Sequence, residues 1–161
     1  MTDVHKLPTL RKIPVYEVRL VQTRRPLWVA EAAVSRPEHA ARTLHALFGL
    51  SDREHFATLF FDGAHNVTGI HVVAIGSQHS VGGLDPRVVF RAAIAAHASA
   101  IIIGHNHPSG NPEPSRPDLA ITTALTAAGK LLDVPILDHI IVTRDATRWY
   151  SMAEHGMLPQ A

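Results

Sequence analysis

The segment Ile101-Ile-Ile-Gly-His-Asn-His-Pro-Ser-Gly-Asn-Pro-Glu-Pro-Ser-Arg-Pro-Asp118 decides how this chain folds and where its chemistry lies. The apolar run 100–103 predicts a short buried strand that ends at Gly104. Alternate residues of an extended chain point the same way, so we expect His105 and His107 to aim at one point. The prolines and glycine of residues 108–114 exclude a helix there and predict a stiff turn.

A helix start follows this turn. Ser115 can accept hydrogen bonds from free N–H groups, Pro117 suits a first helical turn, and Asp118 stands where the acid of a capping box stands. Two neutral imidazoles and one carboxylate are a common ligand set for catalytic zinc, with the fourth position left to water. The sequence therefore predicts a metal site formed by His105, His107 and Asp118. A histidine pair in a loop beside a plain helix cap remains the alternative at this point.

Composition limits the remaining possibilities. The chain has 161 residues, enough for one domain with a sizeable core, and a formal net charge of +1, so no global field draws it to nucleic acid or membrane. It has no cysteine, which excludes disulfides, cysteine-containing zinc sites and thiol nucleophiles. The N-terminal residues form no apolar signal core, and no apolar stretch is long enough to span a bilayer. We expect a cytoplasmic protein without a membrane segment.

Hydrophobic periodicity predicts a mixed α/β (α+β) domain with a sheet of five or six strands and about three helices. We expect a flexible arm at residues 1–12 and a single domain over residues 13–161. The helices are predicted at about 37–48, with Ser35 and Glu38 as a capping box, from 86 to near 97, and at about 116–132. The strands are predicted at 13–21, 27–29, 56–61, 67–75, 100–103 and 136–143, with a last strand or short helix at 149–152.

The spacing of the candidate ligands resembles a known signature. His105-x-His107, then seven residues, then Ser115-x-x-Asp118 resembles the motif of the JAB/MPN-type (JAMM) metalloproteases. The wider text is similar to the RadC family of bacterial JAB-domain proteins, from about Ile13 to the C-terminus. The similar stretches are residues 53–56, 76–77, 85–87, 104–110, 114–115 and 137–142. The resemblance implies the cytidine deaminase-like JAB/MPN fold.

The resemblance also implies roles for further residues. The family pattern carries a glutamate at the start of an early core strand, and Glu54 is the residue that matches it; spacing alone does not separate it from Glu38 or Glu113. Glu54 would then act as the general base toward a water activated by Zn²⁺, and Ser115 would donate to the oxyanion. The implied function is that of a zinc-dependent hydrolase of peptide or isopeptide bonds, with a protein or peptide as its substrate.

Other functions stay open on the sequence. One is a metal-dependent DNA-processing nuclease, or a DNA-repair accessory factor of the RadC type; another is an inactive JAB-like scaffold. Longer RadC proteins carry a helix-hairpin-helix DNA-binding region that nothing here matches, and the near-neutral charge argues against tight DNA binding. The oligomeric state is left open.

Two further features are weaker candidates. The glycine-rich loop 76–83, with His79 and Ser80, would border a substrate groove or form a plain surface loop. Asp138 and His139 lie on a strand predicted to neighbour the site. They would act either as hydrogen-bond partners of a ligand histidine or as a satisfied core pair.

Overall fold

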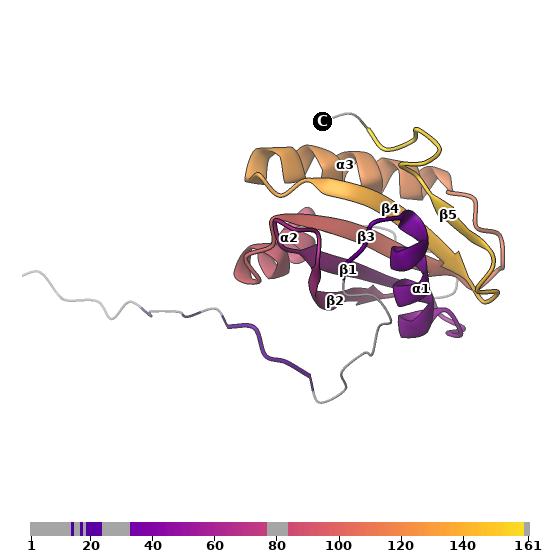
Figure 1. Cartoon of the computed structure of the whole chain (residues 1–161), viewed down its shortest axis with the longest axis horizontal. Coiled ribbons are helices and arrows are strands. Elements are labelled where there is room, and N and C mark those ends of the chain that lie inside the picture. The colour runs from indigo at the N-terminus through magenta and orange to yellow at the C-terminus, as the bar shows by residue number, and fades with distance from the viewer. Residues whose placement is uncertain (1–13, 15–16, 18, 24–32, 77–83, 160–161) are drawn as a thin grey trace, which may run out of the picture.

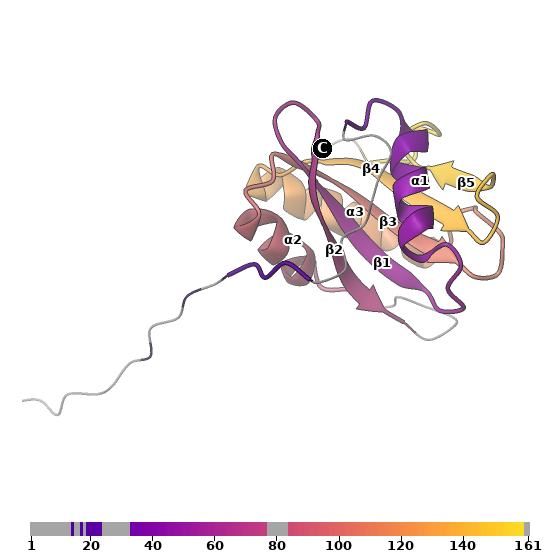
Figure 2. The ribbon, with the colours of Figure 1, turned by 60° about the horizontal axis from the view of Figure 1, so that its bottom comes forward.

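The central feature of the fold is a five-stranded mixed sheet with helices on both faces (Figures 1 and 2). The computed structural model describes residues 14, 17, 19–23, 33–76 and 84–159. The strand order is β2-β1-β3-β4-β5, and the elements are β1 (His55–Phe61), β2 (Val67–Ile75), β3 (Ala100–His107), β4 (Ile136–Thr143) and β5 (Trp149–Ser151). The helices are α1 (Pro37–Phe48), α2 (Pro86–Ala95) and α3 (Arg116–Leu132). The predicted mixed α+β architecture is confirmed.

Strand β3 lies at the centre of the sheet and is buried on both faces. It pairs antiparallel with β1 and parallel with β4, and α3 forms the crossover between the two parallel strands. Ile101 and Ile103 pack with residues of α2 and α3, whereas Ala100 and Ile102 pack with residues of α1. Burial on both faces explains why this strand is a continuous apolar run instead of an alternating one.

Gly104 allows α1 to pack closely on β3. A Cβ atom at this position would collide with the Leu44 side chain of α1 and would come within 2.9 Å of the Ile140 carbonyl oxygen of β4. The backbone oxygen cannot move without disturbing the β3–β4 pairing. The glycine is therefore required by the close approach of these elements.

Replacing Gly104 with alanine is expected to lower the free energy of unfolding by about 1–3 kcal/mol, since overpacking a tight core has this cost. Gly63→Ala is the matched control, because a Cβ at residue 63 meets nothing within 4 Å. Urea unfolding of both variants measures the difference. Equal unfolding midpoints for the two variants would contradict this account of the packing.

Most predicted element bounds are confirmed, with two corrections. Strand β3 does not end at Gly104 but continues to His107, because β1 pairs with it as far as His105 and β4 as far as His107. Helix α1 begins where predicted, but its N-cap is Arg36 and no side chain caps it, so the Ser35–Glu38 capping box is wrong. The capping box of Ser115 and Asp118 at the start of α3 is confirmed.

Several predictions fall wholly or partly outside the described residues. These are the 1–12 arm, the 27–29 strand and most of the 76–83 loop with His79 and Ser80. Of the predicted strand 13–21, the described residues 14, 17 and 19–21 are exposed and form neither helix nor strand. Within the part of the chain that the structure covers, no helix has the length and apolar character needed to cross a membrane.

Candidate metal centre

The candidate centre lies where β3 ends and β1 begins. His105 and His107 alternate with Asn106 along β3, so both imidazoles lie on the face that packs against α2 and α3. The antiparallel register pairs Phe56 of β1 with His105, and Glu54 directly precedes β1. Two segments about fifty residues apart in sequence are thereby brought together at one end of the sheet.

The first turn of α3 brings the fourth side chain to this place. The backbone N–H of Ser115 donates to Asp118 Oδ2 over 2.7 Å, and the Ser115 hydroxyl donates to the same oxygen over 2.5 Å. These two bonds fix the Asp118 carboxylate at the helix N-terminus, where the helix dipole favours negative charge. In the structure, as predicted from the sequence, the end of β3 lies close to the start of α3.

The polar atoms of this cluster are close together. The Nε2 atoms of His105 and His107 are 2.9 Å apart, and Asp118 oxygens lie 3.2 Å from the former and 3.5 Å from the latter. Glu54 Oε1 is 3.9 Å from His107 Nε2. One ligand atom each from Glu54, His105 and His107 lies within 4.8 Å of the others. Both carboxylates therefore stand beside the same imidazole pair.

The cluster has more hydrogen-bond acceptors than N–H and O–H groups that could donate to them. His107 Nδ1 is 2.7 Å from the Asn111 carbonyl oxygen, which can only accept, so the proton of a neutral His107 is on Nδ1 and its Nε2 is bare. Glu54 Oε2 is buried and has no hydrogen-bond partner among the described residues. Bare nitrogen and carboxylate oxygen facing one another are the donor atoms that a divalent zinc-type cation requires. The residues present fit a metal ion.

The electrostatics of the cluster agree with a site that favours positive charge. Burial alone would raise the pKa of the Asp118 carboxyl, but the imidazoles of His105 and His107 beside it and the Ser115 hydroxyl hold this pKa far below its usual range. Burial would lower the pKa of His107, but the protonated ring can donate to both Asp118 and the Asn111 carbonyl oxygen and is attracted by the charges of Asp118 and Glu54, so this pKa is raised on balance. Burial lowers the pKa of His139 well below its usual value, so this ring is neutral.

Asn106 holds Glu54 from the opposite face of the sheet. Its side-chain oxygen accepts from the His55 backbone N–H over 2.7 Å, and its Nδ2 donates to the Arg53 carbonyl oxygen over 2.9 Å. The amide group therefore spans the backbone on both sides of Glu54 and extends the β1–β3 ladder by one step. Asn106 was not predicted as a site residue, although its placement between two inward-facing histidines was a signal for it.

Asn106→Ala is expected to lower the free energy of unfolding by about 2–4 kcal/mol, since each buried group left unpaired costs about 1–3 kcal/mol. Asn111→Ala is the control, because among the described residues its exposed side chain makes one weak turn bond, in which Oδ1 accepts from the Glu113 N–H over 3.3 Å. Chemical denaturation gives both values. A loss for Asn106→Ala no larger than that for Asn111→Ala would show that the amide does not hold this segment.

The other residues singled out by the sequence have distinct places. His139 is fully buried, and its Nε2 lies 2.8 Å from His105 Nδ1. Asp138 instead faces the C-terminal segment, where Ser151 Oγ donates to it over 2.5 Å and the Ala153 N–H over 2.9 Å. Burial raises the pKa of Asp138, against the effect of these hydrogen bonds. The two neighbouring side chains thus point to different places, and of the two only His139 contacts the cluster.

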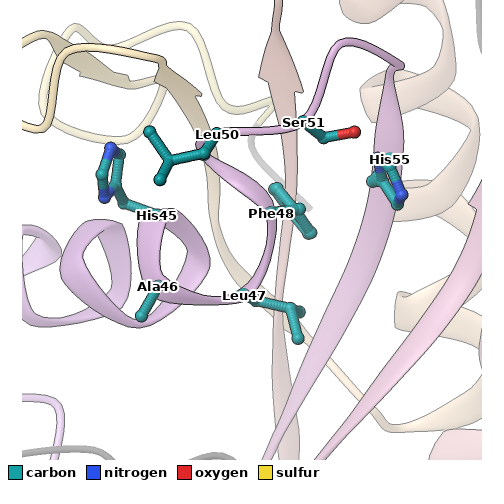
Figure 3. A pocket seen from close by; sticks show the side chains of 8 residues that line it. His45, Ala46, Leu47, Phe48, Leu50, Ser51 and His55 are labelled. Carbon is teal, nitrogen blue, oxygen red and sulfur yellow. The ribbon is translucent and has the colours of Figure 1, made fainter.

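An open pocket of about 280 Å³ lies elsewhere, at the end of α1 (Figure 3). It is lined by residues 45–51 and His55, and by none of the candidate site residues. Phe48 and His55 stack in its wall, with ring centroids 5.7 Å apart. Since His55 alternates with Glu54 and Phe56 along the strand, this pocket and the candidate centre lie on opposite faces of the sheet.

The fold and this cluster together define a class: a mixed α+β domain with a candidate single-metal centre at the end of its central strand. Residues 34–157 match the RadC-like JAB domain family. The chain belongs to this family.

Curated relatives agree with this placement. UPF0758 protein tlr1707 of Thermosynechococcus vestitus is 39% identical over 112 residues, which cover 70% of this chain and 44% of the relative. A UPF0758 protein of Rubrobacter xylanophilus is 35% identical over 140 residues, or 87% of this chain and 59% of the relative. A UPF0758 protein of Methanococcoides burtonii is 38% identical over 106 residues, which cover 66% of this chain and 45% of the relative. The chain thus spans about half the length of the relatives it matches.

Proposed function

We propose that this domain is a zinc-dependent hydrolase of peptide or isopeptide bonds in a protein or peptide substrate. His105, His107 and Asp118 would hold the ion, and Glu54 would act as the general base. The observation that carries the proposal is that two imidazole nitrogens lie 2.9 Å apart, with oxygens of Asp118 at 3.2 Å and 3.5 Å from them and Glu54 Oε1 at 3.9 Å from His107 Nε2.

Mixed nitrogen and oxygen donors favour zinc over magnesium, since magnesium prefers an all-oxygen octahedral set. A zinc ion bound here would supply Lewis acidity, polarising a carbonyl group and acidifying a water molecule. The two carboxylates have different attachments: Asp118 is fixed by the capping box, whereas Glu54 Oε2 has no partner among the described residues. This difference supports Asp118 as the fixed ligand and Glu54 as the group that exchanges protons.

Glu54 would accept a proton from the attacking water and pass it to the leaving amine. Its carboxylate is near the imidazole pair but 12% exposed, so it can contact both the centre and an incoming substrate. General-base catalysis of this kind contributes about 10²–10⁴ in rate. The Asn106 bonds to residues 53 and 55 would hold the Glu54 backbone in place while its side chain moves.

Ser115 would donate its hydroxyl to the oxyanion of the tetrahedral intermediate. The hydroxyl is at the exposed N-terminus of α3 and donates to Asp118 in the absence of substrate. If it turns to the substrate, the Ser115 backbone N–H still holds Asp118 over 2.7 Å. One such donor is worth about 10²–10³ in rate.

A metal assay paired with a substrate panel tests the proposal. Elemental analysis of the purified chain should give about one zinc per chain, and cleavage of a peptide or isopeptide substrate should stop with a chelator and return with zinc. Failure to bind zinc would overturn the proposal. Cleavage of branched DNA that requires Mg²⁺ and survives Glu54→Gln would replace it with the nuclease alternative.

A further inference from the structure

We propose that Thr122 and His139 position His105 for metal binding by fixing the ring tautomer that leaves Nε2 bare. The two residues form a hydrogen-bond relay that runs from the backbone of α3, through β4, to the candidate ligand on β3. This inference rests on the proposed function only in so far as the centre binds a metal. It assigns the direction of each hydrogen bond, which can be tested without any substrate.

The relay begins with the single proton of the Thr122 hydroxyl. Thr122 Oγ1 is 2.6 Å from the Asp118 carbonyl oxygen and 2.6 Å from His139 Nδ1. A carbonyl oxygen can only accept, so a contact this short requires the hydroxyl proton to point at it. The sulfur of Met152, at 3.5 Å, is a weaker acceptor and does not compete. The remaining contact must then be a bond from His139 Nδ1–H to the hydroxyl oxygen.

The proton position on His139 sets the one on His105. A neutral imidazole has a single N–H, so with its proton on Nδ1, His139 presents a bare Nε2. This Nε2 lies 2.8 Å from His105 Nδ1 and can only accept there, so His105 carries its own proton on Nδ1. His105 Nε2 is then bare and faces His107 Nε2 and Asp118 Oδ1.

Burial strongly favours this direction. Thr122 and His139 are both 0% exposed and His105 is 1% exposed, so water does not replace a missing partner. In the reverse direction the Thr122 oxygen and the Asp118 carbonyl oxygen would face each other at 2.6 Å with no proton between them. A buried polar group without a partner is costly, so the reverse tautomer is the minor form at equilibrium.

The relay also links two candidate ligands mechanically. It starts at the backbone carbonyl of Asp118, whose carboxylate faces the centre, and it ends at His105. His139 stands on β4, opposite Ile103 in the parallel β3–β4 register. The helix turn that carries one ligand and the strand that carries the other are thus connected through β4. Thr122 and His139 are positioning residues, since neither lies at the centre itself.

Thr122→Val and Thr122→Ser form a matched pair for the test. Valine keeps the shape of threonine without its hydroxyl, and serine keeps the hydroxyl. Zinc affinity of the full chain, measured by competition with a chromophoric chelator, is expected to fall about 10–100-fold in Thr122→Val, the usual effect of losing an outer partner of a metal-binding histidine. Thr122→Ser is expected to bind within about threefold of the wild type.

Long-range ¹H–¹⁵N NMR of the metal-free chain gives the second readout. We expect the Nδ1–H tautomer of His105 in the wild type and in Thr122→Ser, and a mixture of tautomers in Thr122→Val. An Nε2–H tautomer in the wild type, or equal zinc affinity of Thr122→Val and wild type, would overturn the inference. A wild-type chain that binds no zinc but shows the Nδ1–H tautomer would defeat the proposed function and leave the relay standing.

A second pair covers the case in which Thr122→Val does not fold. His139→Gln offers an amide oxygen near the place of Nε2, which can still accept from His105 Nδ1–H, whereas His139→Leu offers none. We expect His139→Leu to bind zinc at least about tenfold more weakly than His139→Gln. Equal affinity of two folded variants would show that His139 only fills space.

Discussion

Asp118→Ala is expected to lower the affinity for zinc by more than about 100-fold, since losing an outer partner of a ligand already costs about 10–100-fold. The substitution removes the carboxylate whose oxygens lie 3.2 Å and 3.5 Å from the two imidazole nitrogens. The measurement is zinc content after gel filtration, followed by a competition titration. Glu113→Gln is the control: it removes an exposed acid shortly before α3 and should retain zinc fully.

A second variant at the same position separates the loss of a ligand from the loss of the helix cap. Asp118→Ala also removes the capping box, which is worth about 0.5–2 kcal/mol of helix stability, so Asp118→Asn is measured beside it because its amide oxygen can still accept from the Ser115 N–H. If either variant keeps stoichiometric zinc, Asp118 is not a ligand. The ion would then be held by Glu54, His105 and His107, whose ligand atoms also lie within 4.8 Å of one another.

Glu54→Gln is expected to keep the metal and to reduce turnover by about 10²–10⁴, the usual contribution of a general base. The amide has the shape of the carboxylate but cannot take a proton. The measurements are zinc content and kcat on a substrate identified by the panel. Glu154→Gln, at an exposed position on the C-terminal segment, should change neither. Loss of zinc from Glu54→Gln with Asp118→Asn unaffected would exchange the roles of the two carboxylates.

The elements of this fold that could be predicted from the sequence are those with a strong local signal. Helix α3 follows from the Ser115–Asp118 capping box and the apolar spacing after it, and β4 from an apolar run between Pro135 and a turn. The predicted end of β3 at Gly104 was wrong because the prediction followed the apolar run. Backbone pairing instead continues through residues 105–107. Hydrogen bonds between strands are non-local, and the apolar pattern does not report them.

The candidate site residues also divide into those with a local signal in the sequence and those placed by non-local contacts. The histidine pair and Asp118 are close in sequence, so alternation along a strand and a helix cap were enough to place them. Glu54 needed a family resemblance, because only the β1–β3 register brings it to the imidazoles. The contacts of Asn106 and Thr122 depend on how β1 and β4 lie beside them, and no local pattern in the sequence reports that arrangement.

The candidate centre takes its side chains from separate parts of the chain: residue 54, residues 105–107 and residue 118. In the unfolded chain these parts move independently, so a metal ion meets at most the His-x-His pair there. An ion that binds the native state alone stabilises it by RT ln(1 + [M]/Kd), about 2.7 kcal/mol at a hundredfold excess over Kd. Zinc would therefore act as a folding ligand of this domain, and cellular zinc supply would set how much of the protein survives heat and proteolysis.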